Sequence, residues 1–211
     1  MPDTGITGVI LAGGKSRRMG MEKSLAILEG RPLVEHVGTR LRPQVSRLVL
    51  NANGVASRFG NWDLPMVTDD ALGDRGPLAG VLAGLAWARG SAPGGQAIVT
   101  TPADTPFIPR DLVTRLAAGW DGEGIIIAAS RGRVHPVVAM WPMSVEADLR
   151  RDLAKGALSV GGWALSRRHE VVEFADVAGI DPFFNINSPA DLLSATVASA
   201  YISVAEHSGN S

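Results

Sequence analysis

The most chemically distinctive feature of the chain is a glycine-rich turn crowded with basic side chains. The turn spans residues 11–20 (LAGGKSRRMG) and follows a short apolar run. Glycines allow backbone N–H groups to close around an anion without interference from a Cβ atom. The mutual repulsion of the cations in and just after the turn favours an anionic ligand; these cations are Lys15, Arg17, Arg18 and Lys23. The pattern predicts a phosphate site, and the alternative is a strand-to-helix turn that binds nothing.

Two widespread phosphate-binding motifs do not fit this turn. Gly14-Lys15-Ser16 resembles the end of a P-loop, but that motif requires a glycine at position 9, where the chain has Val9. A G-x-G-x-x-G fingerprint is also absent from the sequence. Neither a Walker-type ATPase nor a nicotinamide enzyme is therefore favoured.

A single carboxylate follows another predicted strand. Residues 96–101 lead into Pro102-Ala103-Asp104-Thr105-Pro106, which places Asp104 just beyond a carboxyl end, where ligands sit in open α/β sheets. One carboxylate suits Mg²⁺ that also binds phosphate oxygens, because Mg²⁺ keeps several waters. An Asp that closes a turn on its own backbone is the alternative, and the residue by itself does not separate the two.

Two further groups of small or neutral polar residues could contact a ligand. In Phe183-Phe184-Asn185-Ile186-Asn187, a strand would put both amides on one face and Ile186 on the other. Amides both donate and accept, so they suit polyol, pterin or metal contacts, although asparagines before a helix also serve as caps and turn formers. Gly76, Gly80 and Gly84 allow either close helix-to-sheet packing or close approach of a ligand to the backbone.

The rest of the sequence predicts the scaffold for these groups. Short β-branched runs alternate with segments of helical period, which indicates a three-layer α-β-α fold with a Rossmann-like, mostly parallel sheet and helices on both faces. The expected strands are residues 6–11, 47–51, 65–68, 96–101, 124–129, 134–140, 170–174 and 183–187. The expected helices are residues 32–41, 78–87, 110–118, 144–154, 158–166 and 189–200, the last starting with Ser188 as cap and Pro189 at the first position. We expect one domain over residues 1–197 and a poorly ordered tail over residues 198–211.

Composition excludes several functions. The 211 residues contain 20 Lys+Arg and 21 Asp+Glu, a formal net charge of −1, so no broad basic face for nucleic acid is expected. There is no cysteine, which excludes thiol nucleophiles and disulfides and fits a reducing compartment. The sequence predicts no signal peptide, no membrane-spanning segment and a cytoplasmic location.

Five stretches taken together resemble the molybdenum cofactor guanylyltransferases, a branch of the nucleotidyltransferases that also include sugar-nucleotide pyrophosphorylases. They are LAGGKSRRMGMEKS, GPLAGVLAGL, ADTPFIP, the isolated His135-Pro136 and FFNINSPADL. The resemblance covers residues 6–195 in unbroken order. The L-A-G-x-x-x-R-M-G-x-x-K pattern marks the whole group, while the Gly-Gly form of the loop with GPLAG and N-I-N-S-P-x-D-L is similar to the guanylyltransferase branch.

The resemblance implies a role for each candidate residue. Nucleotide contacts are expected from Leu11, Ala12, Gly13, Lys23, Asn51, Asp70 and Asp104, with Asp69 as the alternative to Asp70. Arg18, Lys23 and Asp104 would be the catalytic residues, and Asp104 would hold Mg²⁺. Molybdopterin would be held by Gly76, Gly80, Asn185 and Asn187, apart from GTP. His135 is interpreted as a structural histidine.

The implied reaction transfers GMP from GTP to Mo-molybdopterin and releases pyrophosphate. It needs no protein nucleophile, since alignment and charge neutralisation can supply the rate enhancement. A cytidylyltransferase or sugar-nucleotide pyrophosphorylase on the same scaffold is the alternative enzyme, and a non-catalytic GTP-binding cofactor carrier is the alternative binding protein. We expect a monomer that has GTP and Mo-molybdopterin as substrates and makes transient contact with proteins that deliver or receive the cofactor.

Overall fold

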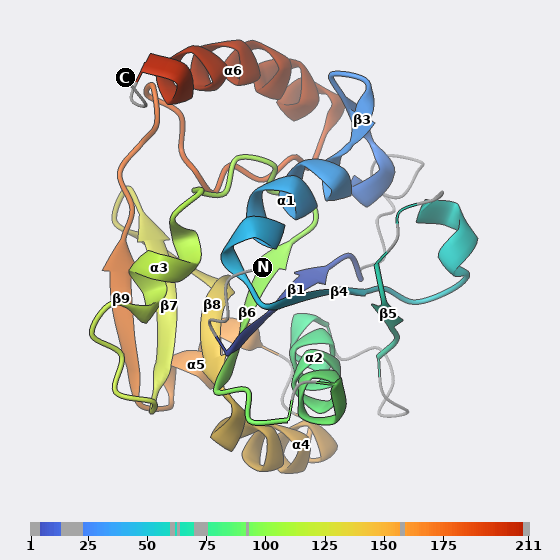
Figure 1. The fold of residues 1–211 in the computed structure, drawn as a ribbon, viewed down its shortest axis with the longest axis vertical. Helices are drawn as coiled ribbons and strands as arrows, with labels where there is room; N and C mark the ends of the chain where they lie inside the picture. Colours follow the sequence, from blue (N-terminus) through green and yellow to red (C-terminus); the bar gives the residue numbers. More distant parts are fainter. Residues whose placement is uncertain are drawn as a thin grey trace.

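A seven-stranded sheet forms the centre of the molecule (Figure 1). The structure is a computed structural model that describes residues 5–13, 23–59, 62, 64–69, 76–91, 93–156 and 159–208, with side chains as far as Ile202. The strand order is β5-β4-β1-β6-β8-β7-β9, and β8 is the strand that runs antiparallel to its neighbours. The strands are β1 (Ile6–Leu11), β4 (Arg47–Asn51), β5 (Met66–Val67), β6 (Ala97–Pro102), β7 (Ile125–Ser130), β8 (Arg133–Pro142) and β9 (His169–Glu173), and a separate small hairpin joins β2 (Ile27–Leu28) to β3 (Arg31–Pro32).

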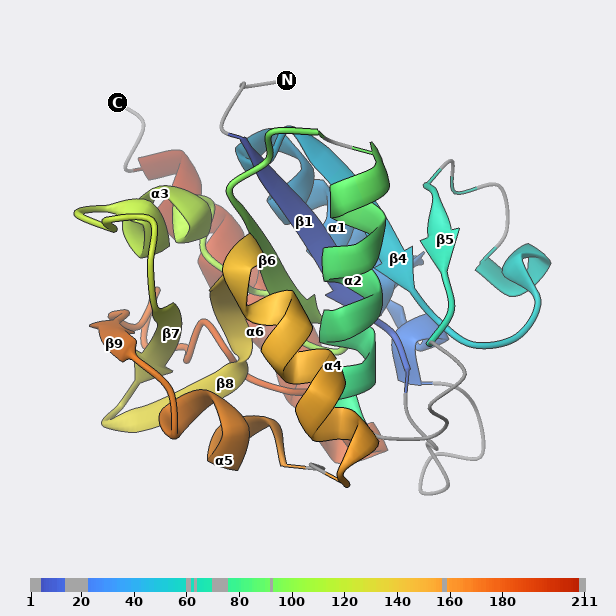
Figure 2. The ribbon, with the colours of Figure 1, turned by 90° about the horizontal axis from the view of Figure 1, so that it is seen from below.

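Helices cover both faces of this sheet, which confirms the three-layer fold. One face carries α1 (Leu33–Leu41) and α3 (Leu112–Ala117). The other carries α2 (Pro77–Ser91), α4 (Glu146–Ala154) and α5 (Val160–Leu165), which lie together in Figure 2. Four short 3-10 helices also occur in the described ranges: η1 (Lys23–Leu25), η2 (Arg42–Gln44), η3 (Ala56–Phe59) and η4 (Met143–Val145).

Strand β1 shows why the sequence builds two cores. Ile10 packs into the layer of α1 and α3, whereas Val9 packs into the layer of α2. Every residue of β1 is buried, so both alternating faces must be apolar or small and the strand appears as one continuous apolar run. Gly84 of α2 is part of the same packing, because a Cβ there would lie 2.7 Å from Cγ2 of Val9. This glycine serves close helix-to-sheet contact.

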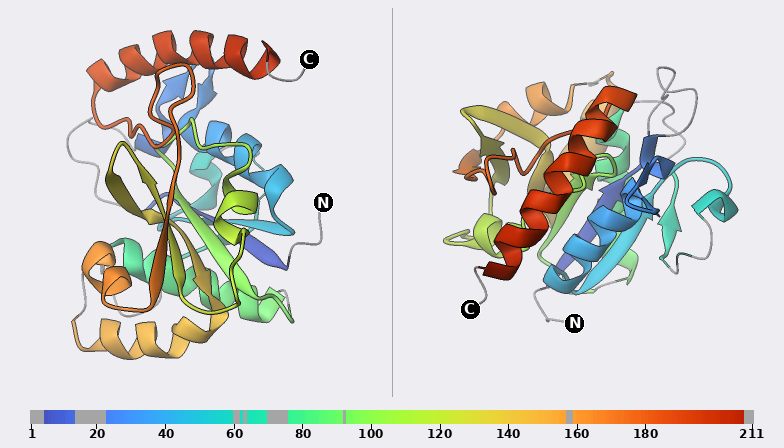
Figure 3. Two further views of the ribbon diagram at one scale, coloured as in Figure 1. Left: turned by 90° about the vertical axis from the view of Figure 1, so that its left-hand side faces the viewer. Right: turned by 90° about the horizontal axis from the view of Figure 1, so that it is seen from above.

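Helix α6 (Pro189–Ser208) lies outside α1, on the α1 and α3 side of the sheet (Figure 3). Its inner side joins a third core that also contains Ala26, just after η1, and residues of the small hairpin and α1; this core includes Leu28, Leu33, Ala195, Ala198 and Ile202. The predicted start is confirmed, since Ser188 Oγ accepts the N–H of Asp191 at 3.2 Å. The predicted end is wrong: the helix continues past Ala200 to Ser208, so the first part of the segment expected to be a tail is helical and packed.

The segment 183–187 is also different from the prediction. It forms no strand, and its backbone bonds go to turns instead. Ile186 N–H donates to the carbonyl of Asp104 at 2.9 Å, and Asn187 N–H donates to Oδ2 of Asp191 at 2.8 Å. Ile186 is fully buried while Asn187 is exposed, so the alternation that suggested a strand arises from an irregular segment.

Within the described part of the chain, no helix has both the length and the apolar character needed to cross a bilayer.

Candidate active site

Three neighbouring parallel strands end in register at the edge where the candidate residues gather. Leu11 of β1 is paired with Asn51 of β4 on one side and with Pro102 of β6 on the other. The ladder continues one residue further, because Ala12 N–H donates to the Asn51 carbonyl at 2.8 Å and Ala103 N–H to the Leu11 carbonyl at 3.0 Å. Because strand carboxyl ends share one edge of a parallel sheet, Gly13, Asn51 and Asp104 are brought to that edge.

Asn51 and its neighbours form a polar cluster at the end of β4. The Asn51 side chain is 2% exposed, and its amide donates to Oδ1 of Asp69 at 3.0 Å. Asn53 donates to the other oxygen of Asp69 at 2.7 Å and accepts the Asp69 N–H at 3.0 Å. Gly13 lies against this group, since a Cβ there would be 3.7 Å from Asn51 Oδ1. Asp69, the alternative weighed from the sequence, is thus a neighbour of Asn51, whereas Asp70 lies outside the described residues.

Gly80 of α2 lies directly against the same cluster. A Cβ at this position would be 2.3 Å from Oδ1 of Asn51 and 2.7 Å from Cδ2 of Leu11. Only a glycine fits there without displacing one of the two. Gly76, just before α2, has a left-handed backbone with φ of 63°, and its carbonyl accepts the N–H of Ala79 at 3.1 Å. The glycines expected to face molybdopterin therefore include one that contacts two predicted nucleotide residues.

A second cluster surrounds Asp104. Burial raises the pKa of its carboxyl group, while the charge of Lys23 and a hydrogen bond from Asn185 act in the opposite direction. Lys23, in η1, donates from Nζ to Oδ1 of Asn187 at 2.5 Å. Lysine and carboxylate are thus held close to both amides. The half-buried Asp104 thus has a positive neighbour and a neutral hydrogen-bond donor.

The donor set beside Asp104 fits a hard cation. Oδ1 of Asn185 is buried and has no hydrogen-bond partner, and it lies on the residue that contacts Asp104. A carboxylate and an amide oxygen are ligands of the type that Mg²⁺ takes, together with water and substrate phosphate oxygens. In the described ranges there is no cluster of three or more His, Cys, Asp or Glu side chains that could bind a metal without such help.

The structure joins groups that the sequence analysis separated. Lys23, expected on the nucleotide side, bonds Asn187, expected on the molybdopterin side. Gly80, expected on the molybdopterin side, touches Asn51 on the nucleotide side. The expected sites for the two substrates are therefore contiguous along one edge. Arg18, together with Lys15 and Arg17, lies outside the described residues.

Sequence reasoning missed Asn53 and the partners of His135. Asn53 follows Asn51 at the end of β4, and the Asn-Ala-Asn spacing was the available signal. His135 bonds Ser130, which bonds Asp181 in turn. That contact joins residues 51 positions apart, and no motif in the sequence marks it.

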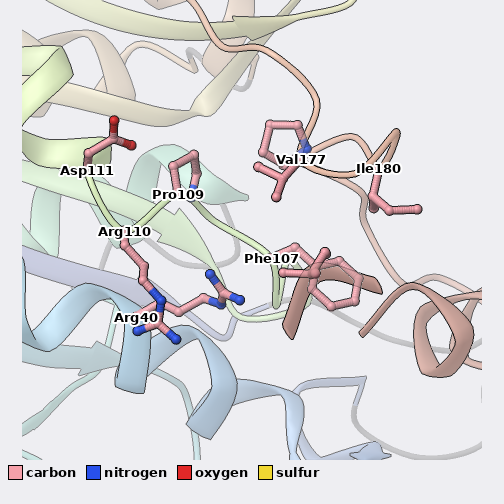
Figure 4. Close-up of a pocket in the computed structure, with 9 residues that line it drawn as sticks. Arg40, Phe107, Pro109, Arg110, Asp111, Val177 and Ile180 are labelled. Atoms are coloured by element: carbon pink, nitrogen blue, oxygen red, sulfur yellow. The ribbon is translucent and has the colours of Figure 1, made fainter. Parts of the chain in front are cut away.

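A pocket of about 290 Å³ lies elsewhere (Figure 4). None of the predicted site residues lines it. Its lining is mostly apolar, with arginines contributing as well, and includes Arg40, Phe107, Arg110, Val177, Ile180 and Ile202. It is bounded by α1, the segment before α3, α6 and the turn before Pro182, and is thus a feature separate from the strand-end site.

Comparison with known proteins assigns a family to this arrangement. The family described as "MobA-like NTP transferase domain" matches residues 8–172. A Bradyrhizobium sp. (strain ORS 278) protein named molybdenum cofactor guanylyltransferase is 43% identical over 195 residues, which cover 91% of this chain and 92% of that protein. A protein of the same name from Mesorhizobium japonicum is 45% identical over 196 residues, covering 90% of this chain and 94% of that one.

Solved structures agree on the fold. Molybdopterin-guanine dinucleotide biosynthesis protein A from Archaeoglobus fulgidus superimposes with a TM-score of 0.72 at 23% identity, covering 92% of this chain and 98% of that one. Rv0371c from Mycobacterium tuberculosis superimposes with a TM-score of 0.70 at 22% identity, covering 91% of this chain and 97% of that one.

Proposed function

Because this chain belongs to the MobA-like NTP transferase family, we propose that it is a molybdenum cofactor guanylyltransferase, which transfers GMP from GTP to Mo-molybdopterin. The observation that carries the proposal is the gathering of Asp104, Lys23, Asn185 and Asn187 beside three strand ends. The level of identity to relatives of that name supports the choice of substrates.

The nucleotide side is proposed to lie at the ends of β1 and β4. Leu11, Ala12 and Gly13 offer backbone groups, and the cluster of Asn51 and Asp69 offers amide and carboxylate oxygens for base or ribose. Gly80 leaves the Asn51 side chain in place because it has no side chain of its own to displace it. Arg18 and Asp70 remain part of the proposal on the resemblance of their motifs alone.

The reaction proposed is an in-line displacement at phosphorus. An oxygen of the terminal phosphate of Mo-molybdopterin forms a bond to the α-phosphorus of GTP, the bond from that phosphorus to the bridging oxygen breaks, and pyrophosphate leaves. Lys23 would neutralise charge on the phosphate oxygens, and its bond to Asn187 keeps the ammonium near the acceptor side. Asn185 would orient the acceptor through its unpartnered amide oxygen.

Mg²⁺ dependence is part of the proposal. Asp104 would hold the ion, with water and the phosphate oxygens of the substrates as its other ligands. When bound, Mg²⁺ would supply neutralisation of the charge that develops on the phosphate oxygens. We further propose that the working form is a cytoplasmic monomer that meets delivering and receiving proteins transiently, and sedimentation of the purified protein tests the monomer.

Thermal unfolding with each of GTP, CTP, ATP and UTP in the presence of Mg²⁺ tests the nucleotide. A ligand at 100 times its dissociation constant stabilises a protein by about 2.7 kcal/mol, so GTP is expected to raise the melting temperature more than the other three. An equal shift with CTP would contradict the guanine assignment. Release of pyrophosphate on addition of molybdopterin separates an enzyme from a GTP-binding carrier, which would release none.

A further inference from the structure

Three side chains outside the site form a continuous hydrogen-bonded chain. Ser130, the last residue of β7, has its Oγ 2.8 Å from Nε2 of His135 on β8. The same hydroxyl donates to Oδ1 of Asp181 at 2.7 Å. That carboxylate oxygen also accepts the N–H of Phe183 at 2.8 Å. The chain therefore links the β7–β8 hairpin to the backbone that leads to Asn185.

The direction of these bonds excludes a hydrolytic triad. A serine hydroxyl has one hydrogen, and here it is donated to Asp181. Nε2 of His135 must then carry a hydrogen and donate it to Ser130, so this histidine cannot act as the base for that hydroxyl. Ser130 is also 0% exposed, which denies it a substrate. The arrangement holds parts of the protein together.

Ring packing adds to the link. The rings of His135 and Phe183 have centroids 4.9 Å apart, and Phe183 meets Phe174 edge-on at 5.3 Å. Phe183 is 4% exposed, so its side chain is fixed in the core. Burial lowers the pKa of His135, and the charge of Arg133 lowers it further. The charges of Asp181 and Glu173 raise this pKa. The neutral ring with hydrogen on Nε2 is the form these surroundings favour.

The segment that this chain holds is placed by individual contacts and not by a strand ladder. Residues 183–187 belong to no strand or helix. Beyond the bond at Phe183, backbone N–H groups donate from Phe184 to the Asp181 carbonyl at 3.1 Å, from Ile186 to the Asp104 carbonyl at 2.9 Å and from Asn187 to Asp191 at 2.8 Å. Among the side chains, Asn187 accepts from Lys23, Asn185 donates to Asp104, and Ile186 is fully buried. Because no ladder places this segment, its path depends on these separate contacts. Asp181 accepts two of the bonds and fixes the end at Phe183, two residues before Asn185.

We propose that Ser130, His135 and Asp181 form a segment clamp that positions Asn185 and thereby sets the affinity for molybdopterin, but not for GTP. The inference rests on the proposed function, since it takes Asn185 to contact the acceptor. The three are positioning residues: they act through the backbone at Phe183 and do not touch substrate. The nucleotide contacts at Leu11, Gly13 and Asn51 are held by the ladders of β1, β4 and β6, which contain no residue of the clamp.

Steady-state kinetics on matched variants tests the clamp. Ser130→Ala removes the shared hydroxyl, and we expect the KM for molybdopterin to rise about tenfold, as for one lost hydrogen bond, while kcat and the KM for GTP change less than about twofold. Thr100→Val is the control, because the buried Thr100 Oγ1 also joins two partners, the carbonyl of Val137 at 2.8 Å and Nε1 of the buried Trp141 at 2.9 Å, on the other face of the sheet. Thr100→Val should lower the melting temperature without raising the KM for molybdopterin.

Three further variants keep the test decisive if Ser130→Ala fails to fold. Asp181→Asn retains an oxygen that can accept from Ser130 and Phe183 and should keep the KM for molybdopterin near that of the wild type, whereas Asp181→Ala should raise it. His135→Phe retains the ring packing but loses the donor, and should also raise it. An unchanged KM in folded Ser130→Ala or Asp181→Ala, or an equal rise in the KM for GTP, would overturn the clamp.

A measurement without substrate separates this inference from the proposed function. ¹⁵N NMR of the histidine ring reports which nitrogen carries the hydrogen. We expect the Nε2–H tautomer for His135, and the Nδ1–H tautomer would overturn the chain of bonds whatever the reaction. If the wild-type protein forms no guanine dinucleotide from GTP and molybdopterin, the proposed function fails, while an Nε2–H result would still support the chain of bonds.

Discussion

Leu11, Asn51 and Pro102 end three parallel strands in register, whereas Asn185 and Asn187 lie on a segment that belongs to no strand or helix. On the first side, each residue is placed by a ladder of backbone hydrogen bonds and by packing on both faces. On the second side, position depends on separate bonds to Lys23, Asp104, Asp181 and Asp191. The residues at the strand ends should therefore be affected mainly by substitutions that change side-chain volume. The segment 183–187 should be affected mainly by substitutions that remove one polar group.

Asp104 lies where the two sides meet, so its removal should have the largest effect. Asp104→Ala is expected to lower transfer at least ~10³-fold, because a group that neutralises or organises the reacting phosphates is worth several kcal/mol. The fold should be retained, since the side chain is half-buried and not part of the core. Initial rates with GTP, Mg²⁺ and molybdopterin measure the effect, and Asp111→Ala, an exposed carboxylate further along the same connection, is the control. Full activity in a folded Asp104→Ala protein would remove this residue from the mechanism.

Added volume at Gly80 should break the strand-end side selectively. A Cβ there would press on Asn51 and Leu11 at 2.3 and 2.7 Å, so Gly80→Ala is expected to cost about 1–3 kcal/mol of stability and to weaken GTP binding. Gly90→Ala in the same helix is the matched control, since a Cβ there meets nothing within 4 Å, and it should be neutral or stabilising by about 0.5–1 kcal/mol. Chemical unfolding and GTP titration report both effects. If Gly80→Ala instead lost affinity for molybdopterin and kept its affinity for GTP, Gly80 would belong to the molybdopterin site.

The smallest effect predicted is the pH dependence of stability at Asp104. Burial raises the pKa of this carboxyl group in the folded protein, so the folded state binds its proton more tightly than the unfolded state does. The protonated form thus favours folding, and that contribution is lost as the pH rises through the folded pKa. Asp104→Asn should therefore melt higher than the wild type at pH 7, with a difference that shrinks as the pH falls towards the unfolded value. Melting curves across this pH range check the prediction. A difference in melting temperature between the two proteins that grows as the pH falls would contradict it.

The sequence predicted the regular half of the molecule well, for a physical reason. Strands β1, β4 and β6 are buried on both faces, so they appear as continuous apolar runs whose ends are easily placed. The segment 183–187 was predicted as a strand because amide and apolar residues alternate there, yet its hydrogen bonds go to turns and side chains that no local pattern reveals. Helix α6 was predicted to end too early: no glycine or proline follows Ala200 before Gly209, so nothing in the sequence stops the helix there.

The site shows the same division. Asn51 and Asp104 could be placed at one edge from their strand ends alone, and the contact of Lys23 with Asn187 could not, because it joins residues 164 positions apart. The separation of the two substrates into different groups of residues was likewise drawn from distance along the chain. Folding brings Gly80 against Asn51 and places both groups along one continuous edge.

The assignment of the two substrates to different residues can be measured by calorimetric titration of two single variants, Asn51→Ala and Asn185→Ala, with GTP and with molybdopterin in separate runs. We expect Asn51→Ala to lose affinity for GTP and to keep its affinity for molybdopterin, and Asn185→Ala to do the reverse, each loss being about 1–3 kcal/mol for a buried hydrogen bond. Melting curves establish that both variants are folded. If Asn185→Ala lost affinity for GTP and left molybdopterin binding intact, the assignment of the two substrates to these residues would be wrong.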